Sequence, residues 1–187
     1  MRLHPVHIPY FEIQEERPMS EQNSCDEFTK LRTKIKSALN EDMCREALDF
    51  VSYLKLSDMT LDPNTNVFKY LDKEVCCLTL DGDSHPCGPW SVYWGDFDIY
   101  EQDNCKVDDR LKSFVLDHIH FCSVYQYNTR PHCNHSPGKN RMIFGNTYRN
   151  VCTSSLQFPT PDAKDVKYIK ELAELRKRNI LAEIQDK

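Results

Sequence analysis

The sequence predicts an α+β fold: an N-terminal helical pair, a mostly antiparallel sheet of five or six strands, and a C-terminal amphipathic helix. Apolar residues recur at helical spacing before residue 60 and after residue 160, while residues 67–158 are rich in β-branched and aromatic side chains. Clusters of turn-forming residues divide that middle region. The 187 residues fit one domain, which we expect at residues 20–187 after an extended arm at residues 1–19.

Capping residues mark the first two helices. Ser24 and Glu27 have the spacing of a capping box, in which each side chain satisfies a backbone N–H near the other residue. Asn40 is expected to cap the second helix. Apolar side chains then share one side of each helix. They are Phe28, Leu31, Ile35, Ala38 and Leu39 in the first, and Met43, Ala47, Phe50, Val51 and Leu54 in the second.

Six segments have the composition of strands. They are residues 67–71, 74–80, 90–100, 113–127, 141–148 and 151–158. Turn residues separate them, as in the stretches DGDSHPCGP and NTRPHCNHSPGKN. The segment 113–127 has an alternative, because apolar residues at its start also fit the helical period. The stretch 108–122 could therefore begin as a helix instead.

The last helix has both a start signal and an apolar stripe. Thr160 is the expected N-cap and Pro161 the first helical residue, with Asp162 and Asp165 where the helix dipole favours acidic groups. The stripe consists of Val166, Ile169, Leu172, Ala173, Ile180 and Ile184. We expect it to pack against the protein's own sheet, because most helix stability comes from burying such a stripe.

Composition points to an intracellular protein, in the cytoplasm or nucleus, without membrane contact. No apolar run approaches the ~20 residues that a membrane span needs. Pro5 and Pro9 interrupt the N-terminal segment, which lacks the apolar centre of a signal peptide. The nine cysteines are odd in number, irregularly spaced and without a CxxC pair. We expect them to be reduced and mostly buried.

Charge is unevenly distributed along the chain. The formal net charge is −5, yet no acidic residue occurs between Asp117 and Asp162. The basic residues of this acid-free segment are Arg130, Lys139, Arg141 and Arg149. Lys and Arg neutralise phosphates, whereas carboxylates repel them, so the segment favours a nucleic-acid partner.

Aromatic residues interleave with these cations. Tyr125, Tyr127 and Tyr148 are candidates for stacking on unpaired bases. We therefore predict a non-catalytic binding module that engages RNA or single-stranded nucleic acid through segment 118–158. The alternative is that these aromatics form the core of the sheet, which is their commonest role.

Histidine and cysteine are concentrated in the same region. His118, His120 and Cys122 would share one side of a strand, because side chains alternate with period two. His132, Cys133 and His135 follow in a loop that can fold back on that strand. Imidazole and thiolate are preferred zinc ligands, so a mixed Cys/His zinc site is one prediction. Without metal, these residues would form a hydrogen-bonded patch.

One stretch resembles a nuclease family. Asp117–His118, Asn128 and Cys133–Asn134 are similar to the DH…N…CN text of His-Asn-His nucleases over about twenty residues. The resemblance implies a metal-dependent nuclease in which His118 activates water while a divalent metal holds the scissile phosphate. This is the catalytic alternative to the binding module.

The ends of the chain suggest a protein partner. Apolar residues of the extended arm, or the last helix, could anchor the domain in a multi-subunit assembly. A third interpretation follows, in which the chain is purely a protein–protein scaffold subunit and its His/Cys cluster is structural.

Overall fold

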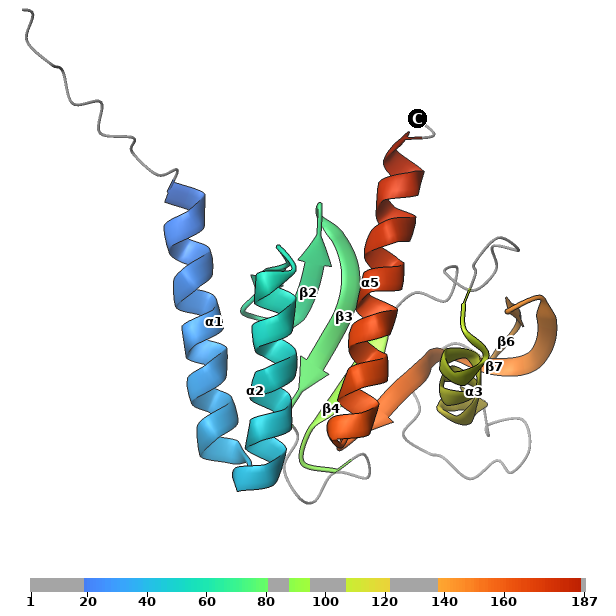
Figure 1. The fold of residues 1–187 in the computed structure, drawn as a ribbon, viewed down its shortest axis with the longest axis horizontal. Helices are drawn as coiled ribbons and strands as arrows, with labels where there is room; N and C mark the ends of the chain where they lie inside the picture. The colour runs from blue at the N-terminus through green and yellow to red at the C-terminus, as the bar shows by residue number, and fades with distance from the viewer. Residues whose placement is uncertain (1–18, 81–87, 95–106, 122–137, 186–187) are drawn as a thin grey trace, which may run out of the picture.

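The computed structural model describes residues 19–80, 88–94, 107–121 and 138–185. Its helices are α1 (Met19–Ala38), α2 (Glu41–Leu56), α3 (Asp109–Asp117) and α5 (Ala163–Gln185). Its strands are β1 (Thr60–Asp62), β2 (Val67–Tyr70), β3 (Lys73–Thr79), β4 (Ser91–Trp94), β5 (Ile119–Phe121), β6 (Lys139–Ile143) and β7 (Asn146–Pro159). The α+β class is confirmed (Figure 1). The predicted arm lies outside the described residues except for Met19, which begins α1.

Every pair of strands in the described sheet is antiparallel. The order is β1-β2-β3-β4-β7-β5, and β6 also pairs with β7. Seven strands within the described residues exceed the predicted five or six. The 14-residue β7 pairs with β4, β5 and β6, so it joins the β1–β4 meander to the other end of the sheet.

The strand predictions need correction at three places. One is the segment 141–148, which contains the turn at Phe144 and Gly145 between β6 and β7. The segment 113–127 was expected as a strand, but residues up to Asp117 belong to α3 and β5 begins only at Ile119. The helical alternative was correct for residues 109–117, because Leu111, Phe114 and Val115 are all buried along α3. Strand β1 was not predicted, since three residues with one buried side chain give no period-two pattern.

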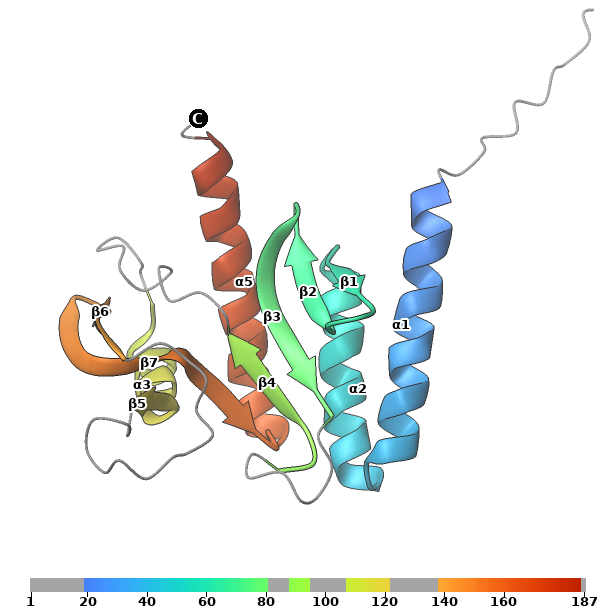
Figure 2. The same ribbon diagram turned by 180° about the vertical axis from the view of Figure 1, so that it is seen from behind.

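The helices cover one face of the sheet. Figures 1 and 2 show α2 and α5 against the β2–β3–β4 region, with α1 on the outer side of α2. Helix α3 lies next to α5, toward the end of the sheet where β5, β6 and β7 meet. Helices and sheet thus form two layers, as the burial of one apolar side of each requires.

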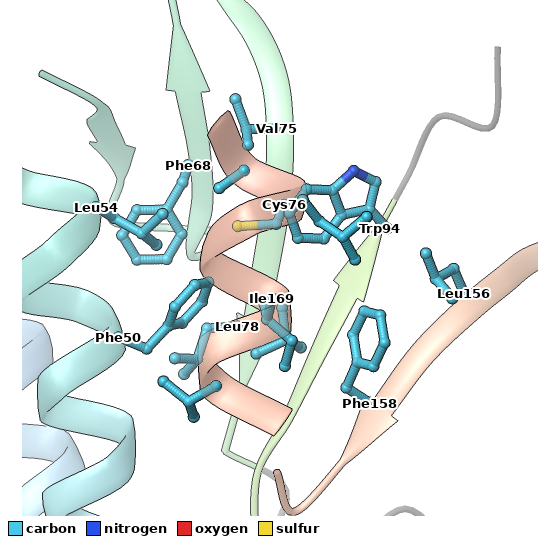
Figure 3. Close-up of a cluster of buried hydrophobic side chains, with 14 of the residues drawn as sticks. Phe50, Leu54, Phe68, Val75, Cys76, Leu78, Trp94, Leu156, Phe158 and Ile169 are labelled. Carbon is cyan, nitrogen blue, oxygen red and sulfur yellow. The ribbon is translucent and has the colours of Figure 1, made fainter. Parts of the chain in front are cut away.

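The core lies between these two layers (Figure 3). Leu78, Val92 and Phe158 form one row across β3, β4 and β7, and all three are buried. Other core side chains meet this row from both layers. They are Phe68, Cys76, Trp94 and Leu156 from the sheet, Phe50 and Leu54 from α2, and Ile169 from α5.

The opposite face of the same strands is polar and hydrogen-bonded. Cys77, Tyr93 and Gln157 form a cross-strand row there. The Gln157 amide donates to the Tyr93 hydroxyl over 2.7 Å, and the hydroxyls of Thr79 and Ser91 lie 2.8 Å apart. Ser91 and Gln157 are buried, so these bonds offset the cost of removing their polar groups from water.

Cys44, Cys76, Cys77 and Cys152 form no disulfide bond. Burial, and then the neighbouring Cys77, raise the pKa of the Cys76 thiol well above its usual value, so Cys76 is an unreactive packing residue. No described helix has the length and apolar character that crossing a bilayer requires.

Helix caps confirm one prediction and correct two. The Asn40 side chain accepts a hydrogen bond from the Met43 amide over 3.0 Å and caps α2 as expected. Ser24 does not start its helix, because α1 begins five residues earlier at Met19. Thr160 does not cap α5 either, since its φ of 44° is left-handed and the helix begins at Ala163.

Asp162 provides the cap of α5 instead. Its Oδ1 accepts hydrogen bonds from the amides of Lys164 and Asp165, over 2.8 and 2.9 Å. The Asp162 amide in turn donates to the Asp165 carboxylate over 3.4 Å. One carboxylate therefore satisfies two of the N–H groups that a helix start leaves without partners.

Asp162→Ala should lower the free energy of unfolding by about 1 kcal/mol, because it removes this cap. Urea denaturation monitored by circular dichroism measures the loss. Lys164→Ala is the control, since Lys164 is exposed in the same helical turn. A loss for Asp162→Ala no larger than that for Lys164→Ala would contradict the assignment.

Candidate functional site

Six of the predicted site residues lie within the described part of the chain: Lys139, Arg141, Tyr148, Arg149, His118 and His120. The others lie outside it: Tyr125, Tyr127, Arg130, Cys122, His132, Cys133 and His135. The described six fall into two places. The first four are on the β6–β7 hairpin, and the two histidines are at the junction of α3 and β5.

Backbone geometry sets the register of the β6–β7 hairpin. Phe144 and Gly145 both have positive φ, 50° and 77°, as a two-residue type I′ turn requires. The turn pairs Ile143 with Asn146. Farther along, the register shifts and Asn150 has a φ of 56°, which is typical of a β-bulge. Lys139 is thereby placed opposite Val151.

One face of the β5–β7–β6 region gathers residues from all three strands, and Lys139, Arg141 and Tyr148 among them were predicted as site residues. Val151 pairs with Phe121 on one side and with Lys139 on the other. Directly opposed residues share a face, so these three form a row with an aromatic ring at one end and an ammonium at the other. Arg141 and Tyr148 are opposed on the same face. We call these five residues the mixed face.

Burial divides the mixed face into a core part and a surface part. Val151 is fully buried, and Tyr148 and Arg141 are half-buried. Phe121 is 53% exposed, and its ring centroid lies 6.4 Å from that of Tyr148. Lys139 is exposed. Tyr148, which the sequence selected for stacking, therefore mainly supports the more exposed ring of Phe121.

Phe121 was not selected from the sequence, although it lies in the same aromatic segment. The signal that distinguishes it is its place on β5, which pairs with β7 alone in the described sheet. Arg149 is not part of the mixed face. It follows Tyr148 directly, so it lies on the opposite face with the exposed Met142 and Thr147.

His118 is the C-cap of α3 and not a strand residue. The prediction that His118 alternates along a strand with His120 and Cys122 is therefore wrong for His118. Its Nδ1 lies 2.7 Å from the Phe114 carbonyl oxygen. Its ring packs at 4.5 Å from Phe114 and 5.0 Å from Phe158, centroid to centroid. His120, by contrast, is exposed on β5.

The hydrogen bond fixes the tautomer of His118. A carbonyl oxygen only accepts hydrogen bonds, so Nδ1 carries the proton. In the neutral ring, Nε2 then keeps a lone pair that can accept a hydrogen bond, accept a proton or bind a metal. This arrangement, with one ring nitrogen held by a backbone carbonyl, is common among functional histidines.

His118 lines a cleft of about 400 Å³ between α3 and α5. We call it the His118 cleft. Besides His118, its lining comprises Arg110, Ser113, Phe114 and Asp117 from α3, and Lys164, Asp165 and Tyr168 from α5. Its volume lies in the range of small-molecule sites, and its lining combines aromatic rings with charges of both signs.

A stack of three rings holds the cleft in shape. Phe114 lies parallel to Phe158 at 5.1 Å, with an angle of 2° between the ring planes. On its other side it stacks on Tyr168 at 4.7 Å. The stack connects β7, α3 and α5, so the cleft rests on the same packing as the core.

The described residues contain no group of three or more His, Cys, Asp or Glu side chains that could hold a metal ion. Four of the six residues predicted as zinc ligands lie outside the described chain. The zinc site therefore stays a prediction.

A second hollow, of about 510 Å³, lies between α2, α3 and α5. The Tyr53 hydroxyl donates to the Glu174 carboxylate there over 2.6 Å, and Lys170 pairs with Asp49 over 2.6 Å. Burial raises the pKa of the Tyr53 phenol, and the hydrogen bond to Glu174 raises it further. These groups satisfy one another and join α2 to α5, which is a structural role.

No protein-family model matches the sequence, and no curated protein or solved structure shows significant similarity to it.

The Nδ1–H tautomer of His118 is directly measurable. Long-range ¹H–¹⁵N spectra at a pH where histidine is neutral should show Nδ1 protonated and Nε2 unprotonated, because the Phe114 carbonyl binds the Nδ1 proton. His118→Gln identifies the signals. An Nε2–H tautomer for His118 would contradict the geometry of the α3 cap.

Proposed function

We propose that this protein is a non-catalytic binding module that engages RNA or single-stranded DNA through the mixed face. The observation that carries the proposal is the row Phe121–Val151–Lys139, which sets an exposed aromatic ring and an exposed cation on one face of adjacent strands. Single-strand binding surfaces combine these two elements, a ring for the bases and a cation for the phosphates.

Distances across the sheet suit this combination. Neighbouring strands lie about 4.8 Å apart, so two strand spacings separate the backbones of Phe121 and Lys139 by roughly 10 Å. Tyr148 supports Phe121 from the same face, at 6.4 Å between ring centroids. Arg141 lies beside Tyr148 and adds a second positive charge.

The surrounding sequence favours a polyanion. The protein as a whole carries a net charge of −5, but the segment from His118 to Pro161 contains no carboxylate side chain. A phosphate backbone approaching the β5–β7–β6 region therefore meets no acidic side chain from these strands. Because such attraction is electrostatic, binding should weaken as salt rises.

A larger assembly is the second part of the proposal. Leu56, Leu71, Leu181 and Ile184 are large apolar side chains that are exposed by 39–83%. They belong to the end of α2, the β2–β3 turn and the last turns of α5, which lie at one end of the molecule (Figure 1). Exposed apolar groups gathered in this way favour a protein partner.

A nuclease is the alternative function. The supporting observation is that His118, with its proton fixed on Nδ1, lines a cleft beside Asp117 and Asp165. An imidazole with a free Nε2 can activate water. Cleavage of single-stranded RNA with Mg²⁺, Mn²⁺ or Zn²⁺ that disappears in His118→Gln, with strand binding retained, would support it.

Lys139→Gln tests the contribution of charge. Affinity for a fluorescent single-stranded oligonucleotide should fall about fivefold at low salt, which corresponds to about 1 kcal/mol. The slope of log affinity against log salt should decrease by about 0.7, the share of one phosphate contact. Fluorescence anisotropy measures both.

Arg149→Gln is the matched control for that experiment. It removes the same charge from the same hairpin, but from the opposite face. It should change affinity less than Lys139→Gln does. Equal losses would show general attraction to the hairpin and reject the mixed face as the binding surface.

Phe121→Ala tests stacking. It should weaken binding at least about fivefold with little change in the salt slope, because it removes a stacking surface and no charge. Met142→Ala is the control, since Met142 is 43% exposed on the opposite face. If the unaltered protein binds no single strand at low salt, the proposal fails and the scaffold interpretation is favoured.

A further inference from the structure

Four large apolar side chains are exposed at one end of the molecule, and packing within the fold does not explain them. They are Leu56, Leu71, Leu181 and Ile184, with exposed fractions of 83, 53, 39 and 49%. We call these four side chains the apolar end. They come from the end of α2, the turn between β2 and β3, and the last turns of α5 (Figures 1 and 2).

One side of α5 connects these elements into a continuous surface. Four of its residues follow one another at spacings of three and four and so share that side: Glu174, Lys177, Leu181 and Ile184. At the end of α2, the Ser57 hydroxyl donates to the Glu174 carboxylate over 3.4 Å. The Lys177 ammonium lies 4.9 Å from the centre of the Tyr70 ring of β2. Leu181 and Ile184 continue the same line to the end of the helix.

Polar contacts hold the β2–β3 turn beside these last turns of α5. The Lys73 ammonium lies 3.9 Å from the Glu183 carboxylate. The Arg176 guanidinium donates to the Glu74 carbonyl over 3.3 Å and to Glu183 over 3.1 Å. Leu71 lies in the turn that these contacts fix, so it belongs to the same surface as the exposed leucine and isoleucine of α5.

Leu71 occupies a backbone position that leucine disfavours. Leu71 and Asp72 have φ values of 48° and 63°, and Tyr70 pairs with Lys73, which is the geometry of a two-residue type I′ turn. Asn and Gly are preferred there, because the side chain of most other residues crowds a left-handed backbone. Leucine at this position costs stability through its backbone and leaves an apolar side chain in water. Contact with a partner would offset both costs.

The charges around the apolar end sum to zero. Residues 55–58, 70–74 and 174–185 contain five cations and five anions: Lys55, Lys73, Arg176, Lys177 and Arg178 against Asp58, Asp72, Glu74, Glu174 and Glu183. The whole chain, by contrast, has a formal net charge of −5. A surface without net charge can face a copy of itself without repulsion, whereas a strongly charged surface needs a partner of opposite charge. Neutrality at this end therefore favours a second copy of the chain.

We propose that the apolar end joins two copies of this chain about a two-fold axis. The proposal rests on the assembly proposed above and names its partner. A two-fold axis makes every contact occur twice, because the same surface of each copy meets the other. Leu181 and Ile184 of one copy pack against Leu56 and the Leu71 turn of the second copy. The apolar side chains form the centre of the interface, and the surrounding charges form its polar rim.

This arrangement leaves the mixed face outside the interface. Figures 1 and 2 show β6 and the adjoining part of β7 beside α3, on the other side of α5 from α2 and the β2–β3 turn. Two joined copies therefore present two mixed faces. A strand long enough to reach both faces binds the dimer with avidity, because its second contact is intramolecular.

Sedimentation equilibrium of the full chain without nucleic acid tests the proposal. A monomer–dimer equilibrium is expected between about 1 μM and about 1 mM protein. Leu181→Lys should weaken the dimer at least about tenfold, because a two-fold axis places the change on both sides of the interface. Met142→Lys is the matched control, since Met142 is 43% exposed but lies on β6. A monomer at every concentration, species larger than a dimer, or equal losses with both variants would overturn the proposal.

Leu71→Asn separates the needs of the fold from those of the interface. Asn suits the left-handed position, so the Tm of dilute, monomeric protein should rise by about 2–4 °C. The same change should weaken the dimer about fivefold or more, because it removes an apolar contact. Differential scanning fluorimetry and sedimentation measure the two effects. An unchanged dimer affinity would place Leu71 outside the interface and contradict the proposal.

Oligonucleotide length connects the dimer to strand binding. In fluorescence anisotropy, a long unstructured oligouridine should bind the unaltered dimer more tightly than it binds Leu181→Lys. Equal affinities would contradict the arrangement with two accessible mixed faces. If the chain dimerises but binds no strand, the proposed strand-binding function fails alone. If strands bind through Phe121 to a chain that stays monomeric, the dimer proposal fails alone.

Discussion

Helix α5 contacts the sheet, α2 and α3, so it helps to position these three parts of the molecule. Ile169 lies in the core with side chains of the sheet. Tyr53 of α2 hydrogen-bonds to Glu174 of α5, and Tyr168 stacks on Phe114 of α3. Burial of an Ile or Leu side chain stabilises a fold by roughly 1.5–3 kcal/mol, so this contact is large compared with the surface ion pairs.

The dependence of α3 on α5 has a consequence for function. Helix α3 has only nine residues, too few to be stable alone. It is held by Phe114, which stacks between Phe158 of the sheet core and Tyr168 of α5. The ring that fixes α3 also forms part of the His118 cleft, and His118 packs against it. The packing that holds the core therefore also fixes the shape of the cleft. A site built on packed helices is positioned more exactly than one on loops.

Sequence patterns correctly predicted the features that depend on residues close together in the chain. Asn40 caps α2 as expected, and the predicted apolar stripe of α5 is buried from Val166 to Ile180, while Ile184 is exposed. A cap and a helical period each involve residues close in sequence. The start of α5 was misplaced by two residues, since Thr160 adopts a left-handed φ while it connects β7 to the helix. The place of His118 was missed for a similar reason: whether it continues a helix or starts a strand depends on Phe158 and Tyr168, which are distant in sequence.

The structure also separates two explanations for the missing acidic residues after Asp117. Burial accounts for Leu156 and Phe158, which lie in the core and leave no room for carboxylates. It does not account for the β6–β7 hairpin, most of whose side chains are exposed. Solvent-facing positions there carry Lys, Asn, Thr and Arg, although Asp suits a turn as well as Asn does. The proposed anionic partner on this part of the sheet would account for the absence of negative charge from this exposed hairpin.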